Sequence, residues 1–254
     1  MKRKRLIAVY DSGIGGLSII PLLQQNYSDC DILYYADTKY FPYGEKSADQ
    51  LAQIAQETLA FLKSYPIDLL IIACHTASIH FLSLLQDQFP FAVIGVSQSI
   101  REEKELLSNY NRVGLIGTKA TIESGYYQTL LHQQCPKLTV VSSACPHLVV
   151  IAEEQLYEEK YIQIMNFTWQ QLKTKEIQGL IFACTHFSFL MKYAKAFYGE
   201  ELPIFSHEGY VMRQVKHYLG ESSSDFLGTI EIVATKENTA FKQKVESLLQ
   251  GIFV

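Results

Sequence analysis

Short apolar runs recur along the chain, and each is followed by a turn signal and then by an amphipathic segment. The runs are almost continuously hydrophobic, which is typical of strands in a parallel sheet that helices cover on both faces. The pattern therefore predicts an α/β protein with mostly parallel sheets. The predicted strands cover residues 6–10, 31–36, 67–73, 91–96, 112–117, 138–143, 179–183, 203–206 and 228–235.

The segments between these runs predict helices. In one of them Ile79, Leu82 and Leu85 recur at a three-residue step, as a stripe packed on a sheet should. Pro21 interrupts the segment after "DSGIGG", so we expect a helix there that begins late and keeps the proline in its first turn. The stretch "GESSSD" (220–225) is the most linker-like. The predicted helices cover residues 48–63, 77–88, 98–107, 123–134, 161–172, 189–197, 210–219 and 238–249.

The two halves of the chain repeat one arrangement. A strand, a small-residue loop and a helix occur around Asp11 and again around Gly117, which lies 117 − 11 = 106 residues later. A second strand end recurs with a similar offset, since Cys74 and Cys184 are 184 − 74 = 110 residues apart. One offset for two strands and their loops predicts two related, pseudo-symmetric α/β domains.

We place the first domain at residues 1–97 plus 208–254 and the second at residues 98–207. Ligands of open α/β sheets bind at the carboxyl ends of the strands. Two such ends that face each other would enclose a cleft between the domains. The cleft would carry Cys74 on one wall and Cys184 on the other.

Both of these cysteines follow a strand and precede a helix, where N-terminal amides stabilise a thiolate. Two thiols that face each other across a ligand suit the inversion of a carbon centre. One thiolate removes a proton as general base, and the opposite thiol delivers one as general acid. Such a reaction needs no cofactor if polar groups stabilise the carbanion-like transition state, for which Asp11, Ser12 and His186 are candidates.

Other interpretations of the motifs are weaker. "DSGIGG" resembles a dinucleotide fingerprint, but that pattern needs a glycine where this chain has Ser18. A Cys2His2 zinc site is disfavoured because the adjacent Cys74 and His75 lack the usual spacer between paired ligands. A thiol hydrolase with a histidine base is chemically reasonable but leaves the duplicated cysteine unexplained. The remaining three cysteines, Cys30, Cys135 and Cys145, are expected to be small buried hydrophobes.

The overall composition excludes several classes of function. The 254 residues are 48% hydrophobic and 19% charged, with a formal net charge of −4, which is typical of a soluble globular protein without a basic face for nucleic acid. The basic start at 2–5 is followed by an apolar run too short for a signal peptide, and no run approaches a membrane span. We therefore expect a cytoplasmic protein with reduced cysteines and no membrane partner.

Several motifs in one order resemble the glutamate racemases of the cofactor-independent aspartate/glutamate racemase superfamily. The resemblance runs from Ala8 to the final helix. It is carried by "DSGIGG" (11–16), "YYADTKYFPYGEKS" (34–47), "IIACHTAS" (71–78), "VIGV" (93–96), "GLIGTKATIESGYY" (114–127), "CPHLVVIAEE" (145–154) and "IFACTHF" (181–187).

The resemblance implies two α/β domains with pseudo-twofold symmetry and an active site between them. It implies that Cys74 and Cys184 are the acid/base thiols and that Asp11, Glu153 and His186 assist them. It also implies a homodimer in the bacterial cytoplasm, without cofactor or metal, that supplies D-glutamate for peptidoglycan, and hence for cell wall biogenesis and cell shape. The implied substrate-binding residues are Asp11, Ser12, Pro42, Tyr43, Gly44, His75, Thr76, Thr118, Thr121, Thr185 and His186.

The chain departs from the family pattern at three places. His75 stands where the family usually has an asparagine that touches the substrate, so its larger ring either turns out of the pocket or narrows or recharges it. Phe187 and Ser188 replace a tyrosine and a proline, and Ser206 and His207 replace an aspartate and a serine. Both cysteines are retained, so the departures bear more on the substrate than on the chemistry.

Three hypotheses follow. The first is interconversion of L- and D-glutamate by two-thiol proton transfer. The second is a catalytically weak relative that binds an acidic amino acid or a protein partner, and the third is a racemase of another acidic amino acid such as aspartate. The "CTH" at 184–186 favours glutamate, because aspartate racemases usually carry glutamate after the Cys-Thr pair.

Overall fold

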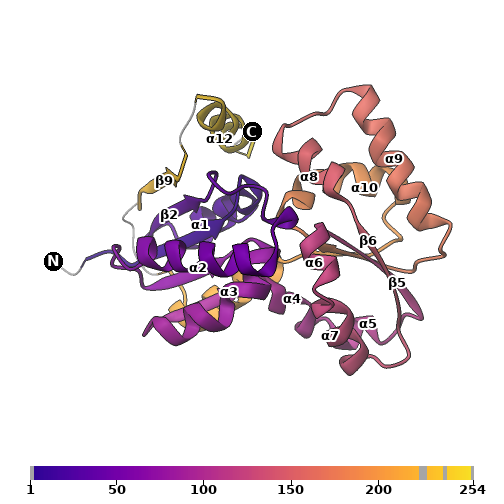
Figure 1. The fold of residues 1–254 in the computed structure, drawn as a ribbon, viewed down its shortest axis with the longest axis horizontal. Coiled ribbons are helices and arrows are strands. Elements are labelled where there is room, and N and C mark those ends of the chain that lie inside the picture. The colour runs from indigo at the N-terminus through magenta and orange to yellow at the C-terminus, as the bar shows by residue number, and fades with distance from the viewer. Residues whose placement is uncertain (1–2, 223–227, 237–238, 253–254) are drawn as a thin grey trace.

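Two parallel sheets form the framework of the protein, as seen in a computed structural model that describes residues 3–222, 228–236 and 239–252 (Figure 1). The first sheet has the strand order β4-β3-β1-β2-β9 and the second β6-β5-β7-β8, and every neighbouring pair is parallel. The α/β class expected from the apolar runs is therefore confirmed. The strands are β1 (Leu6–Asp11), β2 (Asp31–Ala36), β3 (Leu69–Ile72), β4 (Ala92–Gly95), β5 (Arg112–Gly117), β6 (Thr139–Ala144), β7 (Leu180–Ala183), β8 (Ile204–Phe205) and β9 (Ile230–Ala234).

The internal repeat is visible in the strand order. The run β2-β1-β3-β4 of the first sheet has the same connectivity as the whole second sheet, β6-β5-β7-β8. The strands that end at Asp11 and before Cys74 therefore correspond to those that end at Gly117 and before Cys184. Strand β9 extends the first sheet beside β2 and, among the described residues, has no counterpart in the second sheet.

Helices cover both faces of each sheet, because alternate residues of every central strand enter different cores. In β1, Ile7 and Val9 pack into one apolar cluster, whereas Ala8 and Tyr10 pack into another on the opposite face. The second sheet is likewise enclosed by two clusters. Figure 1 shows the two layered halves side by side, with α1, α2 and α3 around the first sheet and α6 to α10 around the second.

The α-helices are α1 (Ile20–Asn26), α2 (Ala48–Leu62), α3 (His75–Gln88), α4 (Ser99–Glu102), α5 (Lys104–Leu107), α6 (Lys119–Glu123), α7 (Tyr126–Gln134), α8 (Pro146–Glu153), α9 (Glu159–Lys173), α10 (Met191–Tyr198), α11 (Glu208–Leu219) and α12 (Thr239–Ile252). Shorter 3-10 turns are η1 (Gly15–Ile19), η2 (Tyr43–Glu45), η3 (Val96–Gln98) and η4 (Thr185–Leu190). The helix after "DSGIGG" begins late with Pro21 in its first turn, as expected.

Three helix predictions need correction. The segment predicted at 98–107 is two short helices, α4 and α5. The segment predicted at 123–134 is also divided, because Gly125 has a φ of 66°, a left-handed conformation that ends α6 and starts α7. Helix α8 was not predicted at all, although Pro146 stands in its first turn, where a proline is well tolerated.

The last two elements return to the first sheet. Strand β9 pairs with β2, and Phe241 and Val245 of α12 are buried in a core cluster of that sheet. The predicted linker at 220–225 lies partly outside the described residues. The proposed limits at 97/98 and 207/208 stay a prediction. Within the described part of the chain no helix has the length and hydropathy to cross a membrane.

Candidate active site

A small closed cavity lies where the carboxyl ends of the two sheets meet. Its volume is about 20 Å³, which is room for about one water molecule. An amino acid needs more space than this. The cavity is lined by eleven predicted site residues, Ser12, Pro42, Tyr43, Gly44, Cys74, His75, Thr76, Thr118, Cys184, Thr185 and His186, together with Phe41 and Val149.

Cys74 follows β3 and caps the N-terminus of α3. Its Sγ accepts the Ala77 backbone N–H at 3.5 Å and lies 3.6 Å from Ser12 Oγ. Burial and the nearby carboxylate of Asp11 raise the pKa of the Cys74 thiol to about 12, although Ala77 and Ser12 partly oppose the rise. In this closed arrangement Cys74 therefore carries its proton at neutral pH.

Cys184 follows β7 and precedes η4, and it has a different set of neighbours. Its Sγ lies 3.9 Å from His186 Nδ1, and His186 Nε2 lies 2.7 Å from Glu153 Oε2. The Ile14 backbone N–H also donates to Glu153, at 3.2 Å. Both His186 and Glu153 are almost fully buried.

His186 and Glu153 form an ion pair inside the protein. Burial alone would lower the pKa of His186, but its contacts with Cys184 and Glu153 raise it well above the usual value. Burial alone would raise the pKa of Glu153, but His186 holds it below the usual value. The imidazolium of His186 thus places a positive charge beside the Cys184 sulfur, where it stabilises negative charge.

Asp11 connects the two halves of the site without lining the cavity. One carboxylate oxygen accepts the Gly13 backbone N–H at 2.8 Å, and the other accepts the Thr185 hydroxyl at 2.9 Å. Asp11 is fully buried, and burial raises its pKa. Since Asp11 ends β1 and Thr185 follows β7, this hydrogen bond joins the two sheets when the cavity is closed.

Three threonine hydroxyls form a second polar connection between the halves. Thr76 Oγ1 lies 3.0 Å from both Thr118 Oγ1 and Thr121 Oγ1, and the latter two are 3.0 Å apart. Thr118 also caps α6, since its hydroxyl accepts the Thr121 backbone N–H. Thr121 lies behind the lining residues and completes this cluster, so it belongs to the wall of the site without reaching the cavity.

The glycines of "DSGIGG" are explained by close approach across the interface. A Cβ atom on Gly13 would lie 2.7 Å from Glu153 Oε2, and one on Gly15 would lie 2.4 Å from Thr185 Oγ1 and 2.7 Å from His186 Nδ1. Real Cβ atoms do not approach neighbours so closely. The motif therefore lets the first half contact the groups that surround Cys184.

The loop before η2 was predicted only in part. Tyr43 lines the cavity, and its hydroxyl donates to Asp37, which in turn accepts the Thr235 hydroxyl at 2.6 Å. Phe41 was missed, although its ring centroid is 5.7 Å from that of His186. Val149 of α8 was also missed, since an apolar side chain gives no chemical signal of a site.

One ring nitrogen of His75, Nδ1, is hydrogen-bonded to a residue outside the cavity. His75 Nδ1 is hydrogen-bonded to the Tyr127 hydroxyl of α7, which does not line the cavity. The ring also meets that of His207 edge-on, with centroids 5.2 Å apart. Burial lowers the pKa of His75 well below its usual value, so the ring is neutral. His75 thus contributes to the interface between the two halves as well as to the cavity wall. His75 and His207, two of the departures from the family pattern, contact each other.

Two other departures, Phe187 and Ser188, lie in η4. Phe187 is fully buried in a core cluster of the second sheet. Ser188 donates to Glu208, at the start of α11. His75 Nε2 and both ring nitrogens of His207 are buried and lack a hydrogen-bond partner among the described residues.

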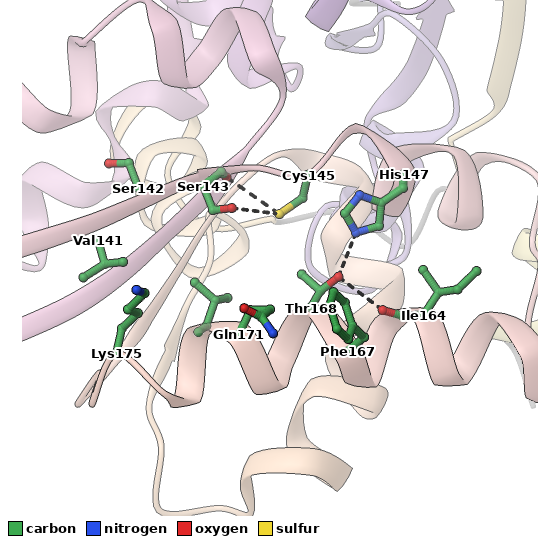
Figure 2. A pocket seen from close by; sticks show the side chains of 11 residues that line it. Val141, Ser142, Ser143, Cys145, His147, Ile164, Phe167, Thr168, Gln171 and Lys175 are labelled. Atoms are coloured by element: carbon green, nitrogen blue, oxygen red, sulfur yellow. Dashed lines mark hydrogen bonds between the residues drawn. The ribbon is translucent and has the colours of Figure 1, made fainter.

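A much larger cavity lies elsewhere, and neither Cys74 nor Cys184 lines it. It measures about 470 Å³ and lies between β6 and α9, as Figure 2 shows. Its walls include Cys145, whose Sγ is near Ser143, and His147, whose Nε2 lies 2.7 Å from Thr168 Oγ1. Phe167 on its rim is 67% exposed. Size alone would select this groove, but it holds one cysteine, whereas the smaller cavity is lined by two cysteines from equivalent strand ends.

The five cysteines are all free thiols. Across residues 3–222, 228–236 and 239–252, no three His, Cys, Asp or Glu side chains are grouped so that they could hold a metal ion. The smaller cavity instead brings together two thiols, the imidazolium of His186 and several hydroxyls. These groups are suited to moving a proton and to binding carboxylate oxygens.

Comparisons with known proteins agree with this class of site. A model of the Asp/Glu/Hydantoin racemase family matches residues 18–201 of the chain. The chain belongs to this family, and the protein is therefore an isomerase of the amino-acid racemase class. The glutamate racemase of Aquifex aeolicus is 31% identical over 244 residues, which cover 96% of this chain and 93% of that protein.

Solved structures show the same fold. A glutamate racemase isoform of Bacillus anthracis superposes with a TM-score of 0.85 at 29% identity, covering 97% of this chain and 94% of that one. The glutamate racemase of Francisella tularensis, solved in complex with D-glutamate, gives a TM-score of 0.82 at 27% identity, covering 97% and 94% of the two chains. Both comparisons extend over the two sheets.

Proposed function

We propose that this protein interconverts L- and D-glutamate, with Cys74 and Cys184 as the two acid/base groups and without a cofactor. The observation that carries the proposal is that the two thiols come from equivalent strand ends and line one cavity. The choice of glutamate is supported by the relatives, which are glutamate racemases, one of them solved with D-glutamate bound.

In the proposed reaction one sulfur, as thiolate, removes the Cα proton and becomes a thiol. The opposite thiol gives its proton to the other face of the carbon and becomes a thiolate. No atom other than hydrogen changes its bonding partner. The reverse reaction exchanges the two roles, so each cysteine serves one enantiomer.

Polar residues around the thiols have supporting roles in this proposal. His186 and Glu153 stabilise charge at Cys184, and Ser12 contacts Cys74. The hydroxyls of Thr76 and Thr118 line the cavity and suit carboxylate oxygens. The remaining predicted binding residues have other places in the proposal: Pro42, Tyr43, Gly44, His75 and Thr185 complete the lining, and Asp11 and Thr121 support it from behind.

Solvent exchange at Cα tests the activity directly. The protein is incubated in deuterium oxide with L-glutamate and, separately, with L-aspartate, and loss of the Cα proton signal is followed by NMR. We expect exchange with glutamate, and we expect both Cys74→Ala and Cys184→Ala to abolish racemisation. Exchange with aspartate alone would reassign the substrate, and no exchange with either amino acid would favour a binding role.

Cys145→Ala is the matched control for these variants. Cys145 is also buried, and it follows β6 at the same edge of the second sheet, but it lines the larger cavity. Its replacement should leave the exchange rate unchanged. If it lowered the rate as much as the other two replacements, the loss would reflect damage to the fold.

We propose that the D-glutamate serves peptidoglycan synthesis, and hence cell wall biogenesis and cell shape, in a bacterial cytoplasm. A homodimer is part of the same proposal, because it is the usual state of the family whose motifs the chain resembles. Expression in a bacterium that needs external D-glutamate should restore growth without it, whereas the Cys74→Ala variant should not. Growth rescue by both forms would contradict this role.

A further inference from the structure

Lys244 is a charged residue of the last helix that reaches the groups beside Cys184. Its Nζ lies 2.7 Å from Glu154 Oε1 and 3.8 Å from Glu153 Oε1, and its side chain is only 20% exposed. Phe241 and Val245 on the same helix are buried against the first sheet. Lys244 therefore extends from the first half of the protein to α8 of the second.

A chain of contacts leads from Lys244 to the sulfur of Cys184. Lys244 faces one carboxylate oxygen of Glu153, and the other oxygen lies 2.7 Å from His186 Nε2. The opposite ring nitrogen of His186 lies 3.9 Å from Cys184 Sγ. Glu153 does not line the cavity, so the chain approaches the thiol from behind.

Uncharged hydrogen bonds fix the same helix against the end of α8. Gln155 Nε2 donates to the Lys244 backbone carbonyl at 3.3 Å, and the Ser247 hydroxyl donates to Gln155 Oε1 at 3.2 Å. Figure 1 shows α12 at the top of the molecule, on the side where α8 lies. These bonds hold the Lys244 backbone in place. A variant that removes one of them therefore tests the docking of α12 without changing the charge of Lys244.

We propose that Lys244 is a positioning residue for proton transfer at Cys184. Its ammonium group keeps Glu153 ionised, so that Glu153 holds the His186 ring toward the sulfur, and as a like charge it limits how firmly His186 keeps its proton. The inference rests on the proposed racemase function. It assigns to the C-terminal helix an electrostatic role in a site that it does not touch.

The sign of the effect follows from the groups around Glu153. Burial alone would raise the pKa of Glu153, whereas His186 and Lys244 lower it. Removing the positive charge of Lys244 should raise the pKa of Glu153, and it should also raise that of His186, which loses a like-charged neighbour. The other titratable groups that act on this cluster are Asp11, Tyr34, Cys184 and Glu154.

Lys244→Met should therefore move both limbs of the pH–kcat profile to higher pH, by up to about 0.7 unit for a partly exposed pair. We expect kcat at neutral pH to fall about two- to fivefold. KM should change little, because Lys244 does not line the cavity. Lys244→Arg keeps the charge and should restore the profile.

Glu154→Gln is expected to act in the opposite direction. It removes the negative charge of Glu154, which is the nearer partner of Lys244. The ammonium group of Lys244 then has Glu153 as its remaining carboxylate partner in this cluster. Both limbs should then move to lower pH. Ser247→Ala is the structural control: it removes an uncharged bond between α12 and Gln155, and it should leave the pH profile unshifted.

An NMR titration of the His186 ring decides the inference independently of turnover. The pKa of His186 should be higher in Lys244→Met than in the unchanged protein, and equal in Ser247→Ala. Equal His186 titrations in Lys244→Met and the unchanged protein would overturn the inference, even if the enzyme racemises glutamate. Absence of racemisation in the unchanged protein would refute the proposed function, while the titration would still report whether the charge of Lys244 reaches His186.

Discussion

Cys74 and Cys184 stand at the ends of equivalent strands in two sheets that share one strand order, yet their surroundings differ. Cys74 contacts a hydroxyl and a backbone amide, and burial raises its pKa to about 12. Cys184 faces the imidazolium of His186, which is paired with Glu153. The backbone repeats, but the charges around the two thiols do not.

This difference teaches that a duplicated scaffold can give two thiols unlike electrostatic surroundings. Burial holds the proton on Cys74, whereas Cys184 lies beside the positive charge of His186. The proposed reaction uses one thiol as general acid and the other as general base, one on each face of the carbon. Each thiol should therefore depend on a different set of neighbours.

The largest expected effect comes from removing the charge on the Cys184 side. His186→Asn should lower turnover by about 10²- to 10⁴-fold, which is typical of losing acid–base assistance. Ser12→Ala removes a neutral contact of Cys74 and should cost roughly two- to tenfold. Steady-state racemisation by circular dichroism measures both. Because the two enantiomers have equal free energy, kcat/KM must fall equally in both directions.

Isotope effects identify which thiol is affected. With Cα-deuterated substrates, His186→Asn should make the isotope effects on the two enantiomers unequal, since only one proton transfer involves Cys184 as base. His147→Asn is the control, because His147 is an exposed histidine of the same half, bonded to Thr168 in the larger cavity. A greater loss in Ser12→Ala than in His186→Asn would reverse the comparison of the two thiols.

Much of the fold was predictable because its cause is local. Apolar runs mark strands that are buried on both faces, and the repeat of Asp11 at Gly117 and of Cys74 at Cys184 follows from one duplicated unit. Helix α8 was missed because its apolar residues, such as Val149 and Val150, lie between a buried cluster and the surface without a clear stripe. The break at Gly125 depends on a left-handed residue that the helical pattern does not reveal.

The sequence predicted those residues of the site that lie within short continuous motifs. The eleven lining residues that were predicted lie in short stretches that resemble family motifs. Contacts between distant segments left no local signal: Lys244 beside Glu153, Tyr127 beside His75, and His207 beside His75 all join residues that only folding brings together. Such pairs are decided by how the two sheets meet.

The smallest expected effect concerns His75, on the Cys74 side. Its hydrogen bond to Tyr127 joins α3 to α7 across the interface, and both groups are buried. His75→Asn should lower the free energy of unfolding by about 1–2 kcal/mol, because it leaves the Tyr127 hydroxyl unpaired. Turnover should fall less than roughly tenfold, since a neutral ring bonded outside the cavity carries no proton in the transfer. Urea unfolding of His75→Asn, Tyr127→Phe and the double variant should give a coupling of about 1 kcal/mol. Additive effects of the two changes on unfolding would show that the His75–Tyr127 bond does not contribute to stability. A loss of turnover as large as that of His186→Asn would show that His75 acts in the chemistry and that the Cys74 side is not the quieter one.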